Sequence, residues 1–188
     1  MTTGYQIKNQ EGLYFLTFQV INWIDIFTRK VYRDIIINNL KYCIENKGLQ
    51  VFAYVIMSNH VHIVLNSTVG KLSDTIRDFK KYTSRIILET FQTGNESRRE
   101  WMLNQFEFAA RKHSRNQSYQ FWTHENHAIE LLKPDFTAEK VDYIHNNPVR
   151  AGIVLNPEDY LYSSARNYAN MENLLDIALI NMPWKTYC

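Results

Sequence analysis

The chain has few cysteines, no long hydrophobic run and no stretch of biased composition. Its 188 residues include only two cysteines, Cys43 and Cys188, too few for the disulfide framework of a small secreted protein. The N-terminus lacks a basic segment followed by a small-residue cleavage site, and polar residues interrupt the first apolar run, which starts at Leu13. These features argue against a signal peptide or a membrane span. We therefore expect a soluble protein of the reducing cytoplasm.

The composition is typical of a single globular domain. The chain is 45% hydrophobic and 14% aromatic, which is enough to form a substantial core. It contains no internal repeat, low-complexity tract or linker. We expect one domain over residues 1–188, with a core at about 13–155 and a C-terminal appendage at 156–188.

The charge is almost balanced overall but is unevenly distributed. The formal net charge is +2, yet residues 71–118 carry ten Lys or Arg against six Asp or Glu, whereas residues 119–188 carry five against nine. A basic middle segment is compatible with a phosphate-bearing partner. A solvated helix face explains it equally well.

Hydrophobic periodicity predicts an α+β fold. The expected elements are a strand at 13–21, a helix at 30–48, strands at 49–57 and 60–65, a helix at 71–91, an edge strand within 119–131, a helix from near Phe136 to Pro148, and a short helix within 157–169. Gly48 is expected at the C-terminus of the first helix, and Ser73 and Thr137 as N-caps of later ones. Residues 92–118 leave two options open, a basic helix around RKHSRNQ or a mobile excursion.

This order of elements is that of a ferredoxin-like (split βαβ) sandwich. Such a fold has an antiparallel sheet with helices on one face. The other face is available for a functional site.

Two histidines, His60 and His62, flank Val61 in an otherwise apolar strand. Residues two apart in a strand point to the same face. The two imidazoles therefore lie side by side and can converge on one metal ion, while Val61 packs into the core. A pair of partly exposed histidines with no ligand is the alternative, and two histidines alone do not identify a metal.

The stretch VDYIHNNPVRAGIV contains a second candidate group. Tyr143 and Asn147 are four residues apart on a predicted helix and share one face, whereas His145 should point away from both. The amide oxygen of Asn147 can bind a divalent cation, with the Tyr143 phenol nearby. Alternatively, Tyr143 is a half-buried core aromatic and Asn147-Pro148 only terminates the helix.

Together these motifs resemble those of the HUH-type single-tyrosine transposases, in particular the REP-associated tyrosine transposases. An H-x-H pair followed by Y-I-x-x-N-P-V-x-x-G is specific, although H-x-H alone is weak. The segments that carry the resemblance are MSNHVHIVL (57–65), DFKKYTSRI (78–86), FWTHENHAIEL (121–131), YIHNNPVRAGIV (143–154) and DYLYSSARNY (159–168).

The resemblance implies a transposase that cleaves and rejoins single-stranded hairpin DNA. By this match His60 and His62 bind the metal, Tyr143 is the nucleophile that forms a 5′-phosphotyrosine, and Asn147 completes the metal site. Similar enzymes use Mg²⁺ or Mn²⁺. Tyr82 lies in a basic helix and is a weaker candidate for the nucleophile, because the resemblance implies that this helix is scaffold and DNA contact. Tyr119 is also weaker, because it has no polar helical neighbour.

Basic and aromatic residues are candidate contacts for DNA. Phe121 and Trp122 can stack on bases or fill the core, and the core is favoured for Trp122. The oligomeric state, monomer or homodimer, stays open; the short connection at 132–136 favours a tyrosine that acts in its own chain. The basic candidates are Arg77, Lys80, Lys81, Arg85, Arg111, Lys112, Arg115 and Arg150.

Two other functions stay possible from the sequence. A nucleic-acid-binding module without catalysis can use the same fold, although such modules present aromatic residues on the sheet rather than histidines. A metal-dependent hydrolase that forms no covalent adduct is the other.

Overall fold

The computed structural model describes residues 6–94, 96–112 and 118–181. Its helices and strands are β1 (Tyr14–Gln19), α1 (Lys30–Lys47), β2 (Leu49–Ile56), β3 (His60–Ser67), α2 (Leu72–Thr93), α3 (Arg99–Arg111), β4 (Ile129–Glu130), α4 (Pro134–Arg150) and α5 (Ala165–Tyr168). Short 3₁₀ turns lie at Ile21–Trp23, Ile26–Thr28 and Pro157–Asp159. None of the described helices is both long and apolar enough to cross a membrane.

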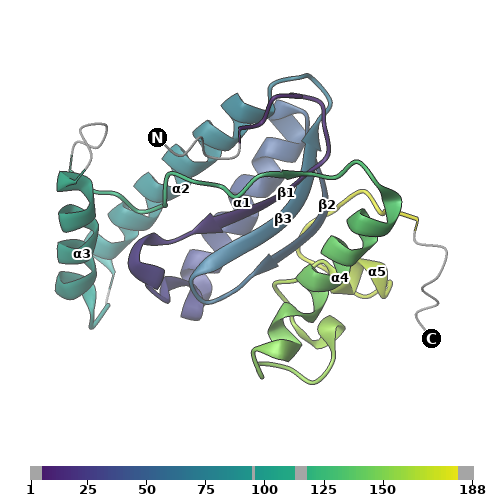
Figure 1. The fold of residues 1–188 in the computed structure, drawn as a ribbon. Coiled ribbons are helices and arrows are strands. Elements are labelled where there is room, and N and C mark those ends of the chain that lie inside the picture. The colour runs from purple at the N-terminus through teal and green to yellow at the C-terminus, as the bar shows by residue number, and fades with distance from the viewer. Residues whose placement is uncertain (1–5, 95, 113–117, 182–188) are drawn as a thin grey trace.

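The sheet has the order β2-β3-β1-β4 with antiparallel neighbours. This is the strand order of a ferredoxin-like sandwich, so the predicted fold class is confirmed. Helices α1 and α2 pack against one face, and α4 contacts β2 and β3 from the other (Figure 1). Helix α3 stands at the end of the sheet, near the 3₁₀ turn that follows β1.

Both edges of the sheet are covered by irregular chain. The segment before α4 runs along β1, where Thr17 N–H donates to Asn126 O and Thr123 N–H donates to Gln19 O. On the other edge, Ile56 N–H donates to Tyr162 O and Ser164 N–H donates to Tyr54 O. These hydrogen bonds use backbone groups that an open sheet would leave exposed. The predicted edge strand therefore exists largely as irregular backbone, with only Ile129–Glu130 as regular strand.

The hairpin and the first helix agree with the sequence prediction. Gly48 ends α1 with φ of 62°, in the left-handed region that glycine adopts easily. In β3, every second side chain points toward α1 and α2. These side chains are almost fully buried: Val61, Ile63 and Leu65. This alternation leaves His60 and His62 on the opposite face.

The predicted ends of α4 are wrong at both termini. The helix starts at Pro134, whose fixed φ suits the first turn, and Thr137 lies inside it, with Oγ1 donating to Lys133 O. Pro148 also lies inside α4, in its last turn, where the proline removes one helical N–H without ending the helix. The helix ends after Arg150 at Gly152, which has φ of 69°. Gly152 N–H and Ile153 N–H then donate to the carbonyls of the last turn.

Three further predictions differ from the structure. Ser73 does not cap α2: the helix already begins at Leu72, and Ser73 N–H donates to Gln10 Oε1. Residues 92–118 contain a regular helix, α3, which ends at Arg111, the first residue of the RKHSRNQ stretch. Residues 113–117 of that stretch lie outside the described part of the chain. The short helix expected within 157–169 is only a 3₁₀ turn and the four-residue α5.

Candidate active site

His60 and His62 lie side by side on the face of β3 that is covered by α4. Their ring centroids are 4.5 Å apart. His62 is 7% exposed, and Val61 between them is fully buried on the other face of the sheet. The alternation of the strand thus produces the geometry that the sequence predicts.

Each histidine is held by a second polar side chain. Asn59 Oδ1 lies 2.6 Å from His60 Nδ1, while Asn59 Nδ2 donates to Trp23 O. Because the amide nitrogen is bonded to a carbonyl, the oxygen faces the ring, and His60 Nδ1 carries the proton. His60 Nε2 is then left with its lone pair. Thr17, the cross-strand partner of His62, places Oγ1 2.8 Å from His62 Nδ1, an arrangement that orients many metal-binding histidines.

Both rings are neutral at physiological pH. Burial lowers the pKa of His60 to about 4. Burial also lowers the pKa of His62 to about 3, with smaller contributions from His60 and the Lys140 ammonium. A neutral imidazole is the form that binds a metal ion.

Tyr143 lies on α4 directly over His62. Its Oη is 3.4 Å from His62 Nε2, and the two ring centroids are 5.1 Å apart. Phe15 of β1 contacts both rings: it stacks on His62 at 5.4 Å and meets Tyr143 edge-on at 6.0 Å. The Tyr143 ring therefore packs on side chains of β1 and β3.

Asn147 follows Tyr143 by one helical turn and is half-buried. His145 points away from this face, as predicted: its Nε2 is 2.9 Å from Ser164 Oγ, and its ring packs against Tyr168. In the described part of the chain, no three His, Cys, Asp or Glu side chains cluster as a metal site would require. A metal at this face would therefore need an amide, such as that of Asn147, or a substrate phosphate in addition to the histidines.

Two cations flank the tyrosine ring along α4. Lys140 Nζ is 5.9 Å and Arg150 Cζ 5.6 Å from the Tyr143 ring centroid. The Lys140 side chain is only 19% exposed and also contacts the rings of Phe15 and Phe136. The face of α4 toward the sheet thus carries positive charge on both sides of the phenol.

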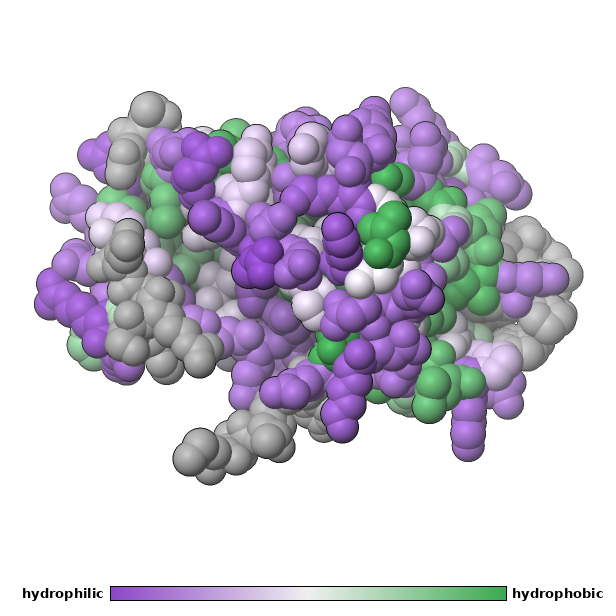
Figure 2. Space-filling view, turned by 90° about the horizontal axis from the view of Figure 1, so that it is seen from above, coloured by the Kyte–Doolittle hydropathy of each residue, from purple (hydrophilic) through white to green (hydrophobic). Residues whose placement is uncertain are grey.

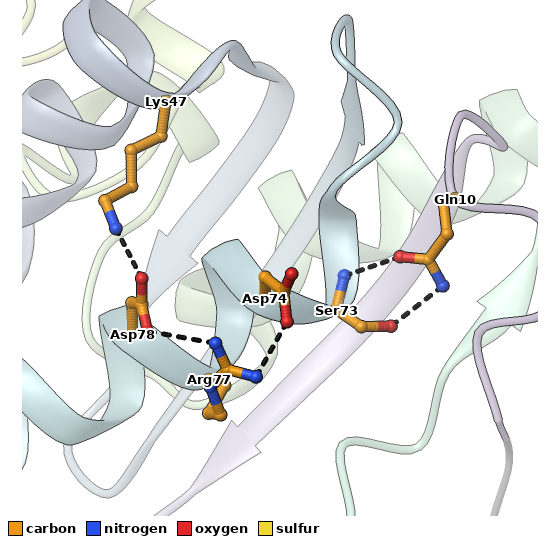
Figure 3. Close-up of polar contacts among 6 residues, drawn as sticks. All are labelled: Gln10, Lys47, Ser73, Asp74, Arg77 and Asp78. Carbon is orange, nitrogen blue, oxygen red and sulfur yellow. Dashed lines mark hydrogen bonds and ion pairs between the residues drawn. The ribbon is translucent and has the colours of Figure 1, made fainter.

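The other basic candidates lie away from the histidines. Four of them line a groove of about 1180 Å³ between α2 and the segment around 118–128: Arg77, Lys80, Lys81 and Arg85. Arg77 forms ion pairs with Asp74 and Asp78, as Figure 3 shows.

Lys80, a predicted DNA contact, is hydrogen-bonded within the chain. Its Nζ donates to Thr123 O and Asn126 Oδ1, and burial lowers its pKa to about 8. Lys80 therefore ties α2 to the edge of the sheet. Phe121 and Trp122 are also buried, in the core.

At the end of α3, Arg111 pairs with Glu107, and Nζ of Lys112, the residue after the helix, lies over the Phe108 ring. Arg115 lies outside the described residues. Figure 2 shows one face of the molecule as largely hydrophilic, with hydrophobic side chains scattered among polar ones.

Sequence reasoning missed several residues around the site. Lys140 precedes Tyr143 by three residues, so helical spacing alone places it on the same face. The position of Thr17 beside His62 depends on the register between β1 and β3, which cannot be read from the sequence. Nothing in the sequence pattern pointed to Asn59 or Trp23.

Comparison with known proteins identifies the family. A family model described as "Transposase IS200 like" matches residues 13–147, which is more than half of the chain. The chain belongs to the IS200-like transposase family. The predicted membership of a tyrosine transposase family is thereby confirmed, and with it the prediction of a transposase.

Structural comparison agrees with this assignment. The transposase has the fold of a solved structure described as a REP-associated tyrosine transposase bound to a REP hairpin, with a TM-score of 0.58 and 16% sequence identity. The match covers 100% of this chain and 99% of the other. The search of curated protein sequences found no match to this transposase.

Proposed function

We propose that this transposase cleaves and rejoins single-stranded hairpin DNA through a covalent bond to Tyr143. The observation that carries the proposal is the position of Tyr143 Oη, 3.4 Å from His62 Nε2 and beside the His60 ring. A phenol next to two neutral imidazoles combines a nucleophile with metal ligands in one place. The solved structure of similar fold, bound to a REP hairpin, supports hairpin DNA as the substrate.

The donor set fits a divalent cation, Mg²⁺ or Mn²⁺. The lone pair of His60 Nε2 is free because Asn59 holds the proton on Nδ1, and His62 Nε2 faces the same space as Tyr143 Oη. His60, His62 and Asn147 would hold the ion, which would supply positive charge to neutralise and polarise a bound phosphate.

The chain's own groups carry out the transfer. Tyr143 Oη loses its proton and bonds to phosphorus, while the bond from phosphorus to the 3′ oxygen breaks and that oxygen takes up a proton. The products are a 5′-phosphotyrosine and a free 3′-OH. Attack by a DNA 3′-OH on the same phosphorus reverses these changes, releases Tyr143 and joins two strands. The phosphodiester energy is conserved in the tyrosine ester.

Positive charge on α4 and α2 can hold the DNA. Lys140 and Arg150 lie beside Tyr143, where they attract the phosphates next to the one that reacts. The groove lined by Arg77, Lys81 and Arg85 is a separate basic surface, which suits the hairpin stem. Lys80 contributes through the fold rather than by direct contact.

We expect the tyrosine to act in its own chain, and the contact between Tyr143 and His62 within one chain supports this. Mixing a His62→Ala variant with a Tyr143→Phe variant tests this point. Each variant lacks one half of the site, so the mixture stays inactive if both halves come from one chain. Recovery of activity would mean that the tyrosine is supplied by a second copy.

The function is tested with 3′-labelled DNA hairpins from the region around the gene, incubated with Mn²⁺. The label is expected to move to a denaturation-resistant protein adduct, and Tyr143→Phe is expected to abolish the adduct. Tyr82→Phe is the matched control, because Tyr82 is an exposed tyrosine on α2. Cleavage that survives Tyr143→Phe would indicate a hydrolase, and binding without cleavage would indicate a binding module.

A further inference from the structure

Trp23 is an exposed aromatic residue at the edge of the candidate active site. It is 59% exposed, although tryptophan is a residue that proteins usually bury to a large extent. Its ring centroid lies 6.1 Å from that of His60, and the two planes meet at 81°. Trp23 is thus largely open to solvent next to one of the two proposed metal ligands.

The backbone around Trp23 is held in an unusual conformation. Asn22 and Trp23 have φ of 52° and 57°, in the left-handed region, which is unfavourable for a bulky residue such as tryptophan. Consecutive strained residues persist only where neighbouring groups hold them, and they cluster at functional sites.

Hydrogen bonds from three directions hold this turn. Trp23 N–H donates to Val20 O, Asn59 Nδ2 donates to Trp23 O, and Asn22 Nδ2 donates to Gln105 Oε1 of α3. Asn59 is also the partner of His60 Nδ1. One side chain therefore fixes both the tryptophan and the histidine, so the distance between indole and imidazole is well defined.

We propose that Trp23 is a stacking platform for one unpaired base of the substrate DNA, next to the phosphate that binds at His60 and His62. This inference rests on the proposed function, because that function brings a single strand to the two histidines. Bases of a single strand stack on exposed aromatic rings whatever their identity. Trp23 is thus a positioning residue: it fixes where the strand lies, and it does not select the base.

The chain offers a matched control. Trp101 on α3 is 50% exposed, so it resembles Trp23 in residue type and exposure. It is not part of the candidate active site. Trp101→Ala therefore reports the effect of removing an exposed indole elsewhere on the surface.

The test uses hairpins in which 2-aminopurine replaces one base of the single-stranded flank at a time, in the Tyr143→Phe background so that the DNA stays intact. Stacking quenches 2-aminopurine fluorescence. We expect strong quenching at one position, or two adjacent ones, beside the scissile phosphate. Trp23→Ala is expected to abolish this quenching and weaken binding roughly tenfold, or about 1.4 kcal/mol. Trp23→Phe should retain part of both, and Trp101→Ala should change neither.

The outcomes separate this proposal from the proposed function. Unchanged quenching in Trp23→Ala, or an equal loss in Trp101→Ala, would overturn the stacking role even if the protein with Tyr143 forms its covalent adduct. If quenching is position-specific and depends on Trp23, but the protein with Tyr143 intact forms no adduct, the stacking role stands and the proposed cleavage is wrong. Circular dichroism of each variant at the assay temperature verifies that it is folded.

Discussion

The hydroxyl of Thr17 gives the sharpest test of how the histidine pair is held. In a Thr17→Val variant the β-branched shape is kept in β1, but the oxygen 2.8 Å from His62 Nδ1 is lost. His62 is 7% exposed, so its Nδ1 would be left buried without a partner. The cost is about 1–3 kcal/mol in the free energy of unfolding. Loss of an outer partner of a metal-binding histidine also reduces metal affinity or activity about 10–100-fold.

The assay measures the rate of adduct formation against Mn²⁺ concentration. We expect the Mn²⁺ requirement of Thr17→Val to rise about 10–100-fold. Thr83→Val is the matched control, because Thr83 is a buried threonine whose Oγ1 accepts a hydrogen bond from Trp122 Nε1 on the other side of the sheet. It should lose similar stability without a change in Mn²⁺ dependence. An unchanged Mn²⁺ dependence in Thr17→Val would refute the role of Thr17, and with it the reasoning that His62 binds metal.

Three further predictions concern titratable side chains that are buried or partly buried. His145 is 3% exposed, and burial lowers its pKa to about 4. At this residue the unfolded chain therefore binds more protons than the folded chain below about pH 6.5. Lowering the pH from 7 to 5 should thus reduce the free energy of unfolding by about 2 kcal/mol through this residue. Urea unfolding at both pH values should show a smaller loss in His145→Phe, and an equal loss would contradict this. Lys140→Gln should slow adduct formation about tenfold with little change in stability, whereas an unchanged rate would exclude Lys140 from the site. Lys80→Met should increase amide hydrogen exchange around Thr123 and Asn126, and unaltered exchange there would show that Lys80 does not tie this segment to α2.

The parts of the fold set by local patterns were predictable. Strand alternation around Val61 places the two histidines on one face of the sheet. The helical repeat places Tyr143 and Asn147 on one face of α4. The end of α1 at Gly48 follows from the conformational freedom of glycine. Each of these features depends on residues within a few positions of one another.

The errors arose where local rules compete. Pro148 predicts a helix end, but a proline in the last turn loses only one hydrogen bond, and Gly152 is the residue that ends α4. Ser73 and Thr137 have the chemistry of N-caps, yet the helices begin earlier, at Leu72 and Pro134. The edge segment bonds to β1 through irregular backbone, which hydrophobic alternation does not describe.

Several residues of the site depend on contacts far apart in sequence. Thr17 meets His62 only through the register of β1 and β3, and Lys80 is withdrawn from the surface by a segment more than forty residues later. Trp23 reaches His60 through the turn that Asn59 holds. Lys140 is the exception, because its spacing from Tyr143 was already visible in the sequence.

The central claim is that Tyr143 forms the covalent bond to DNA. Mass spectrometry of the protein after reaction with a hairpin and Mn²⁺, followed by nuclease and protease digestion, tests it most directly. The account predicts a nucleotide attached through its 5′ phosphate to the peptide that contains Tyr143. A nucleotide on another residue, or cleaved DNA with no modified peptide, would contradict it.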